Sequence, residues 1–451
     1  MNEIAGLPFW EVRFDADGDV DAQSERDSTT GIVAAGITDL LVFAHGWNND
    51  ADAANALYRG YFTFVPGLLA GRLPAGRKVG LLGVYWPSKR WSDEPAPDFA
   101  ADLGAGGGAA GFAALPTFPP PPPPDEQTRE ALLDAFPNVR ESVIDDLVGL
   151  LRDRPDDLGS LRRAHHLIAV ASWSQGPGGT VDDGDGSAAV PPFAQAGRDG
   201  KAVSEEFLQA LEEQGVVTSG AGGDAGFGDG LRRLWHGTQE AARQATYWQM
   251  KRRAGEVGER GLGPYLARLH AAAGGLSSNL IGHSFGARLV SFALRSMSGQ
   301  AGRVRSVTLL QGAFSHYAFA AELPFDKSRG GGLRGLQSLV AGPVVACYSQ
   351  HDSAVGVFYP LASLASGQDE SGFGDPMDRW RGMGADGHQP PAVALQLQPA
   401  GTSYTWPPDG KLVSIDAQSV VRHGRPPSGA HSDICHAELA WIPLSAGGVI
   451  R

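Results

Sequence analysis

Short, mostly apolar runs alternate along this chain with segments in which apolar residues recur at helical spacing. A run of about four to eight apolar residues bounded by turn residues is typical of a buried strand, whereas repeats at i+3 and i+4 indicate an amphipathic helix. The expected strands are Phe9–Phe14, Asp39–Ala44, Leu81–Trp86, Leu280–Ile281, Val304–Leu310, Pro343–Tyr348, Val393–Leu397 and Leu412–Ile415. The expected helices are Thr128–Phe136, Ser142–Leu151, Val203–Leu211, Thr238–Ala254 and Ile434–Trp441, with others that start near Ala53 and after Gly286. This alternation predicts an α/β fold with a mostly parallel central sheet and flanking helices.

About 200 residues separate Trp86 from Gly282, far more than one connecting helix requires. We therefore divide the chain into a core of residues 1–90 and 237–451 and an inserted cap of residues 91–236. Gly104–Gly111 consists of glycine and alanine and follows no expected strand, so it is interpreted as a flexible linker and not as a dinucleotide-binding turn. The run Pro119–Pro124 is expected to be a stiff spacer, with SH3-type docking as the alternative. The alternative to a folded cap is a disordered insertion.

The most informative motif is Gly282-His283-Ser284-Phe285-Gly286, between an apolar strand and an amphipathic helix. In this context G-x-S-x-G is typical of a nucleophile elbow, a sharp turn that lifts a serine hydroxyl out of the backbone. The residues two before and two after the serine must be small, or the strand and the helix collide. Gly282 and Gly286 meet that requirement, so Ser284 is the expected nucleophile. A surface turn rich in glycine and serine is the alternative.

A serine nucleophile needs a base, and the base needs a partner that fixes its tautomer. Asp352 comes just after the expected strand Pro343–Tyr348, where a side chain points into the crevice at the carboxyl ends of the strands. It is the expected acid, and a turn or N-cap carboxylate is its alternative role. The base is expected to be His431, in a loop of small residues that can reach across the sheet. Its rival is His436, which falls inside the expected helix Ile434–Trp441.

An oxyanion hole requires two backbone N–H donors that point at the developing negative charge. One should come from Phe285, the residue after the nucleophile. The other should come from Trp47, in the His45-Gly46-Trp47 turn that follows the expected strand Asp39–Ala44. Gly46 permits close approach of the backbone, and Asp50 or Asp52 can cap the next helix.

These segments together resemble the serine α/β-hydrolase superfamily. The residues that carry the resemblance are His45-Gly46-Trp47-Asn48-Asn49, Tyr85-Trp86-Pro87-Ser88, Gly282–Leu289 and Ala430–Ile434. The order Ser284, Asp352, His431 along the chain is also the order of the triad in that superfamily. The sequence is similar in particular to a poorly characterised bacterial branch whose first loop reads H-G-aromatic-N-N. The resemblance covers about the first 90 and the last 200 residues, and it implies an α/β-hydrolase fold with esterase, lipase or related acyl-hydrolase chemistry.

Composition narrows the function classes further. The formal net charge of −13 argues against binding of nucleic acid or of anionic membranes as a main function. Cys347 and Cys435 are the two cysteines, too few for a disulfide framework, and they read as small buried residues. His165 and His166 lack further ligands at useful spacing, so no metal and no cofactor are expected. The start of the chain has no basic and apolar leader, and no apolar stretch approaches the roughly 18 residues of a membrane span, so the cytoplasm is the expected compartment.

The expected function is therefore that of a serine hydrolase that cleaves carboxylic esters, with a small-molecule or lipid ester as its partner. Ser284 would attack, His431 would transfer the proton, Asp352 would orient His431, and Trp47 and Phe285 would hold the oxyanion. An acyltransferase or a thioesterase that uses the same residues is the alternative within enzymes. A catalytically silent module that binds a partner through its cap or proline run is the alternative outside them.

Overall fold

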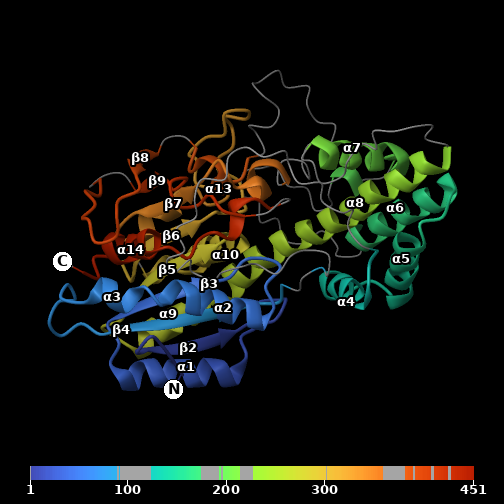
Figure 1. Ribbon diagram of the computed structural model, residues 1–451. Helices are drawn as coiled ribbons and strands as arrows, with labels where there is room; N and C mark the ends of the chain where they lie inside the picture. The colour runs from blue at the N-terminus through green and yellow to red at the C-terminus, as the bar shows by residue number, and fades with distance from the viewer. Residues whose placement is uncertain are drawn as a thin grey trace.

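Figure 1 shows a computed structural model of the chain. It describes residues 2–88, 91, 123–173, 192–194, 197–213, 227–300, 302–358, 381–389, 392–407, 411–424 and 428–450. The predictions for Gly104–Gly111 and for residues 119–122 of the proline run lie outside these ranges. The strands are β1 Asn2–Ile4, β2 Leu7–Arg13, β3 Asp39–Ala44, β4 Val79–Tyr85, β5 Ser277–His283, β6 Val304–Leu310, β7 Val344–Tyr348, β8 Val393–Gln396 and β9 Leu412–Asp416.

Most helical segments of the described chain are α-helices, and the others are 3₁₀ or π turns. The α-helices are α1 Ala22–Ala35, α2 Ala51–Phe62, α3 Val65–Leu69, α4 Glu126–Ala135, α5 Glu141–Asp153, α6 Leu158–Trp173, α7 Gly200–Glu213, α8 Phe227–Glu256, α9 Gly263–Ala272, α10 Phe285–Ala293, α13 Met383–Asp386 and α14 Ala437–Ala446. Short 3₁₀ turns are η1 Pro192–Ala194, η3 Leu294–Ser296, η4 Ser298–Gln300, η5 Leu336–Leu339 and η7 Ala430–Ser432. Two segments are π-helical, η2 Val257–Leu262 and η6 Ala354–Phe358.

The described strands form one nine-stranded sheet in the order β1-β2-β4-β3-β5-β6-β7-β9-β8. Every pairing in it is parallel except that of the edge strand β1 with β2. The α/β class and the mostly parallel sheet expected from the sequence are thus confirmed.

Both faces of the sheet are covered, and the strand sequences show why. In β3, Leu40, Val42 and Ala44 face one hydrophobic cluster, while Leu41 and Phe43 face the other. The first cluster includes residues of α1, η2, α8, α9 and α10, and the second includes residues of α2, α3 and α14. A strand buried on both faces needs apolar residues at every position, which is why β3 and β4 read as continuous apolar runs.

The strand order changes direction at β3. The chain passes from β3 to β4 on one side of it and later to β5 on the other side, and both pairings are parallel. In open α/β sheets the crevice beyond such a switch point, at the carboxyl ends of the strands, is where ligands bind. The ends of β3 and β5 carry the His45-Gly46-Trp47 turn and the Gly282–Gly286 motif, so the topology brings these two motifs together.

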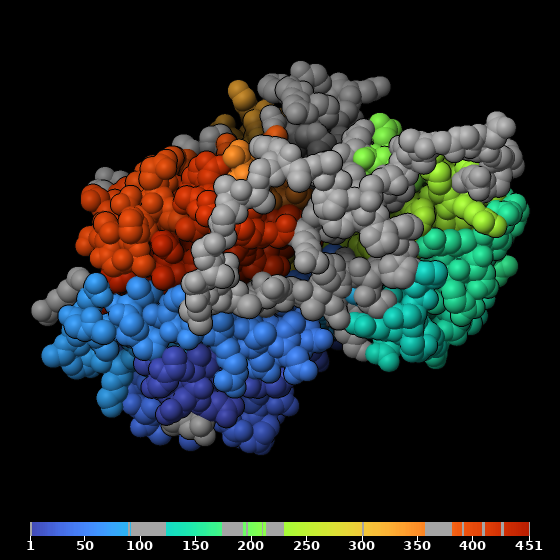
Figure 2. Space-filling model, in the orientation of Figure 1, coloured from blue at the N-terminus to red at the C-terminus, as the bar shows by residue number. Residues whose placement is uncertain are grey.

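The segment between β4 and β5 forms a helical unit beside the sheet (Figure 1). In it α5, α6 and α7 pack together, and α6 and α7 also pack against α8. Figure 2 shows the blue amino-terminal and red carboxyl-terminal atoms together on one side of the molecule and the helices from α4 to α6 on the other. Because α8 is continuous from Phe227 to Glu256, the expected boundary at residues 236 and 237 falls inside one helix. Helices α1, α6 and α9 were not predicted.

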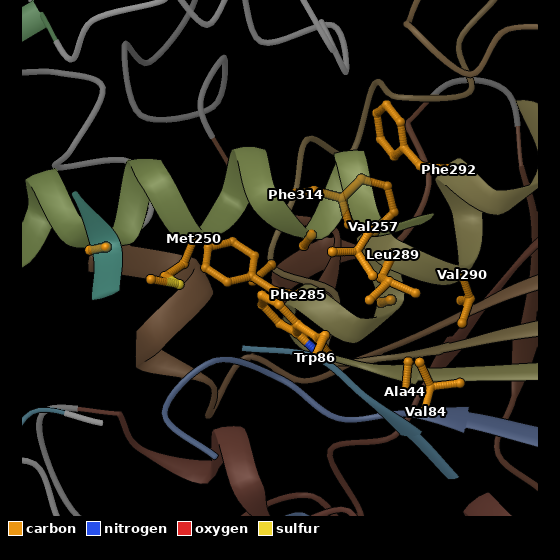
Figure 3. Packing of buried hydrophobic residues seen from close by; sticks show 14 of the residues in the cluster. Ala44, Val84, Trp86, Met250, Val257, Phe285, Leu289, Val290, Phe292 and Phe314 are labelled. Atoms are coloured by element: carbon orange, nitrogen blue, oxygen red, sulfur yellow. The ribbon is translucent and has the colours of Figure 1, made fainter. Parts of the chain in front are cut away.

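The helix α8 continues through η2 into α9 and lies closely against α10. A side chain at Gly258 would overlap the carbonyl oxygen of Leu289, so only glycine permits this approach. Figure 3 shows the packing, with Met250 and Val257 near Phe285 and Leu289. The same hydrophobic cluster contains buried residues of the sheet, of α10 and of α4 to α8, so the insertion and the core share one apolar interior.

A buried cation also joins the insertion to the core. Arg253 of α8 donates to the carbonyl oxygen of Pro87, just after β4, at 3.1 Å, and to the Asp134 carboxylate of α4 at 2.6 Å. Its side chain is only 3% exposed. Of the helices that the structure describes, none is both long enough and apolar enough to cross a membrane.

Candidate active site

Ser284 stands at the turn between β5 and α10 in a strained conformation. Its φ of 56° and ψ of −122° lie in a region that favours glycine, at a cost of about 1–3 kcal/mol. Neighbouring backbone groups hold it there. The Ser284 N–H donates to Leu310 at 3.0 Å, and the Ser284 carbonyl accepts from Ala287 at 3.1 Å and from Ala313 at 3.2 Å.

The glycines of the motif are required by contact. A Cβ atom at Gly282 would overlap the carbonyl oxygen of Gly286, and one at Gly286 would overlap the carbonyl oxygen of Ala44. A Cβ at Gly46 would lie 2.6 Å from the Cβ of Ser284. The turn after β3 and the turn after β5 are therefore in direct contact at Ser284.

His431 and Asp352 form a buried pair next to this turn. The Nδ1 atom of His431 donates to Oδ2 of Asp352 at 2.8 Å, because a carboxylate can only accept. The Asp352 side chain is fully buried, and that of His431 is 13% exposed. A bridge between Asp352 and Gly429, with a bond of 2.9 Å from Ala430 N–H to the His351 carbonyl, joins the two loops. The hydrogen bond to Asp352 fixes the His431 imidazole with its proton on Nδ1, and Nε2 is then the nitrogen that can accept a proton.

The elbow also touches the histidine loop directly. His283 Nε2 donates to the His431 carbonyl oxygen at 2.8 Å, and the two rings lie 4.9 Å apart. Burial lowers the pKa of His283 to about 3, so its ring is neutral near pH 7. Within the described part of the chain the Ser284 hydroxyl forms no hydrogen bond. In enzymes, the hydrogen bond between a nucleophile and its base commonly tightens only when substrate is bound.

His436 is engaged elsewhere. It is the N-cap residue of α14, which starts at Ala437 and not at Ile434 as expected. Its Nε2 atom lies 2.8 Å from Oδ1 of Asp433. Burial alone would raise the pKa of Asp433, but hydrogen bonds from His436 and from two backbone N–H groups lower it overall. Of the two rival histidines, His431 is the one that contacts Asp352 and His283, the residue before Ser284.

The turn after β3 is held rigidly by side chains. The Gly46 carbonyl accepts from His45 Nδ1 at 2.9 Å, from Ser88 Oγ at 3.2 Å and from Asn49 Nδ2 at 3.2 Å, and the Trp47 carbonyl accepts from Asn49 Nδ2 at 2.8 Å. With these carbonyls turned inward, Asn48 takes a left-handed φ of 62°. Among the described residues the backbone N–H groups of Trp47 and Phe285 have no acceptor.

The motif His45-Gly46-Trp47-Asn48-Asn49 and the motif Tyr85-Trp86-Pro87-Ser88 contact each other directly in the structure. The Trp86 ring stacks on the His45 ring at 5.7 Å, and its Nε1 donates to the His45 carbonyl at 2.9 Å. Burial lowers the pKa of His45 to about 4, so this histidine is a neutral structural group. The helix that follows is capped by Asp50, whose carboxylate accepts from Ala53 N–H at 2.9 Å, and not by Asp52.

Two residues at this site were not predicted. Tyr247 of α8 packs edge-on against Trp47, with ring centroids 5.6 Å apart, and lies 4.7 Å from Phe285. No local pattern in the sequence shows that α8 returns to this turn. Gln311 directly follows β6, as Asp352 follows β7, and its amide donates to the Asp352 carboxylate at 3.1 Å. The rule that selected Asp352, a polar residue just after a buried strand, could also have found Gln311.

No group of three or more metal-ligating side chains occurs in the ranges that the structure describes. His165 is buried on α6, where its ring lies 2.7 Å from the Ser204 hydroxyl, and His166 is exposed. Comparisons of the chain with protein-family models, with curated proteins and with solved structures find no match.

Proposed function

We propose that this protein is a serine hydrolase of the α/β-hydrolase type that cleaves carboxylic esters through an acyl-enzyme intermediate. The observation that carries the proposal is the buried pair of His431 and Asp352, whose histidine contacts His283, the residue before the strained Ser284, at the switch point of the sheet. A strained serine next to an oriented histidine is the general arrangement of an activated nucleophile.

The chemistry follows from the orientation of His431. Ser284 Oγ attacks the ester carbonyl carbon while His431 Nε2 takes the hydroxyl proton, and the same nitrogen then gives that proton to the leaving alcohol. Water attacks the acyl-enzyme with the help of His431, and the acid is released with Ser284 restored. Asp352 keeps the Nδ1 proton in place and stabilises the imidazolium that forms in each step.

The backbone N–H groups of Trp47 and Phe285 would bind the oxyanion of each tetrahedral intermediate. The contact between Gly46 and Ser284 and the fixed carbonyls of Gly46 and Trp47 support this assignment. Donors fixed in advance are worth about 10²–10³ in rate each, since they need not reorganise during the reaction. The helical segment between β4 and β5 would act as the cap, and α8 would bring Tyr247 to the site from the part of that helix that follows residue 236.

The direct test is labelling with a fluorophosphonate probe, followed by hydrolysis of short p-nitrophenyl esters. The wild-type protein should gain one adduct on Ser284, and Ser284→Ala should lose both labelling and turnover by several orders of magnitude. Ser291→Ala is the matched control, because Ser291 is a buried serine of α10 whose hydroxyl donates to the Ala287 carbonyl at 2.8 Å. Wild-type protein that stays unlabelled would contradict the proposal and favour the silent module.

The assignment of the base is tested in the same assay. His431→Ala and Asp352→Asn should each lower kcat by orders of magnitude, because the base is then missing or wrongly oriented. His436→Ala should change kcat little and lower the melting temperature, since it removes the contact with Asp433. Equal losses of kcat in both histidine variants would contradict the assignment. Acyl thioesters and acceptor alcohols offered to the wild-type enzyme distinguish a thioesterase or an acyltransferase from an esterase.

A further inference from the structure

Gln311 is a buried residue in an unusual conformation at the carboxyl end of β6. Its φ of 48° is left-handed, and its side chain is fully buried. A residue other than glycine in this region costs about 1–3 kcal/mol, and such residues gather at functional sites. The Gln311 N–H donates to the Cys347 carbonyl of β7 at 3.2 Å, which holds the residue beside the strand that leads to Asp352.

The side-chain amide of Gln311 points at the acid. Its Nε2 atom donates to Oδ2 of Asp352 at 3.1 Å, the same oxygen that accepts from His431 at 2.8 Å. The other carboxylate oxygen, Oδ1, accepts from the N–H of Val355 at 3.3 Å. The oxygen that orients the histidine therefore divides its charge between one histidine and one neutral amide.

The amide is fixed by α13, which packs against it. The second acceptor of Gln311 Nε2 is the Gly384 carbonyl at 3.1 Å, and a Cβ at Gly384 would lie 2.5 Å from the Gln311 carbonyl carbon. The helix is itself held by a bond of 2.8 Å from Met383 N–H to the Phe314 carbonyl and by His316, whose Nδ1 lies 2.9 Å from the Asp386 carboxylate. If the Gln311 amide turned away from Asp352, it would also lose its hydrogen bond to α13.

We propose that Gln311 is a positioning residue of the hydrolytic site, which fixes the Asp352 carboxylate and through it sets the orientation and basicity of His431. The proposal rests on the proposed function. A hydrogen bond to a carboxylate draws charge from it, so the amide weakens the hold of Asp352 on a protonated His431. Among the described residues, the titratable ring in contact with that of His431 is His283, which burial keeps neutral.

The test variant is Gln311→Met, which keeps the length of the side chain and removes the donor. Without the amide, Asp352 should hold the imidazolium more tightly, so the base should release its proton at higher pH. The acid limb of kcat/KM against pH should move upward by about one unit, and kcat should fall about tenfold with KM nearly unchanged. Thr308→Val is the matched control, because Thr308 is equally buried on β6 and hydrogen-bonds none of Ser284, Asp352 and His431 in the described structure.

A second measurement separates this proposal from the proposed function. The titration of His431 is followed by NMR in protein with ¹⁵N-labelled histidine, with the signal assigned from His431→Gln. This midpoint does not depend on turnover, and it should rise in Gln311→Met and stay unchanged in Thr308→Val. Gln311→Glu, a variant of equal size, should raise it further at pH values where the new carboxylate is ionised. Equal midpoints in wild type and both Gln311 variants would overturn the positioning role, whereas a missing Ser284 adduct in wild type would overturn the hydrolase instead.

Discussion

At the scale of single residues, Ser284 shows a conflict between stability and chemistry. Its backbone lies where glycine is favoured, and three hydrogen bonds of its own peptide groups hold it there. A serine that served only the fold would have no reason to occupy this position. The strain is explained if the hydroxyl must project from the turn, because a relaxed backbone would return it to the sheet.

This gives a stability prediction for Ser284→Gly measured against Ser284→Ala. Both variants lack the hydroxyl, but only glycine adopts the backbone conformation without strain. Relief of about 1–3 kcal/mol, less roughly 0.7 kcal/mol of extra chain entropy in the unfolded state, leaves Ser284→Gly more stable by about 1 kcal/mol. Urea unfolding of the two variants measures the difference. A less stable glycine variant would show that the turn carries no strain at this residue.

At the scale of elements, three of the site residues that the sequence predicted lie just after the ends of strands, whereas His431 lies in the turn η7 before α14. Trp47, Ser284 and Asp352 each follow a buried apolar run, and a parallel sheet brings such ends to one edge whatever lies between them. Local sequence could therefore predict that the turns that carry Trp47, Ser284 and Asp352 lie at one edge of the sheet. It did not predict Tyr247, because the position of α8 is set by close packing between Gly258 and α10, which no local pattern encodes.

Tyr247 gives a prediction on selectivity. Its ring packs against the side chains of both Trp47 and Phe285, the two residues whose backbone would hold the oxyanion. Tyr247→Ala should open space there and raise the kcat/KM ratio of hexanoate to acetate p-nitrophenyl esters by about tenfold, a typical change for a few methylene groups in an apolar pocket. Trp248→Ala is the control, because Trp248 is the next residue of α8 and forms no ring contact with Trp47 or Phe285 in the described structure. An unchanged ratio in Tyr247→Ala would place the acyl chain elsewhere.

At the scale of the whole molecule, the insertion is part of the interior. One hydrophobic cluster runs from the sheet through α10 and α8 to α4, α5 and α6, and Arg253 ties α8 to the loop after β4. The number of residues between Trp86 and Gly282 predicted an inserted cap, but length alone does not show that a long helix of this segment packs into the core. Deletion of the insertion would therefore uncover apolar surface on the core.

The histidines give a prediction for the pH dependence of stability. Burial lowers the pKa of six of them, to about 3 for His283 and to about 4 for the others. The other histidines of this group are His45, His165, His236, His270 and His388. Between pH 6.5 and about 4 the unfolded chain binds protons that the folded chain excludes. The stability from these groups is therefore fully present above pH 6.5 and is lost as the pH falls toward 4.

Two adjacent histidines of α6 test this linkage, since His165 is buried and His166 is exposed. His165→Gln keeps a donor for the Ser204 hydroxyl and removes the titrating ring, so it should lose about 1.4 kcal/mol less than wild type when the pH falls from 7.5 to 5.5. His166→Gln is the matched control and should follow the wild-type curve, because His166 is the exposed neighbour on the same helix. The free energy of unfolding in urea at the two pH values measures each loss. Equal losses of unfolding free energy in His165→Gln and wild type would mean that the His165 ring is protonated in the folded protein. Burial of this ring would then contribute nothing to the acid sensitivity of the fold.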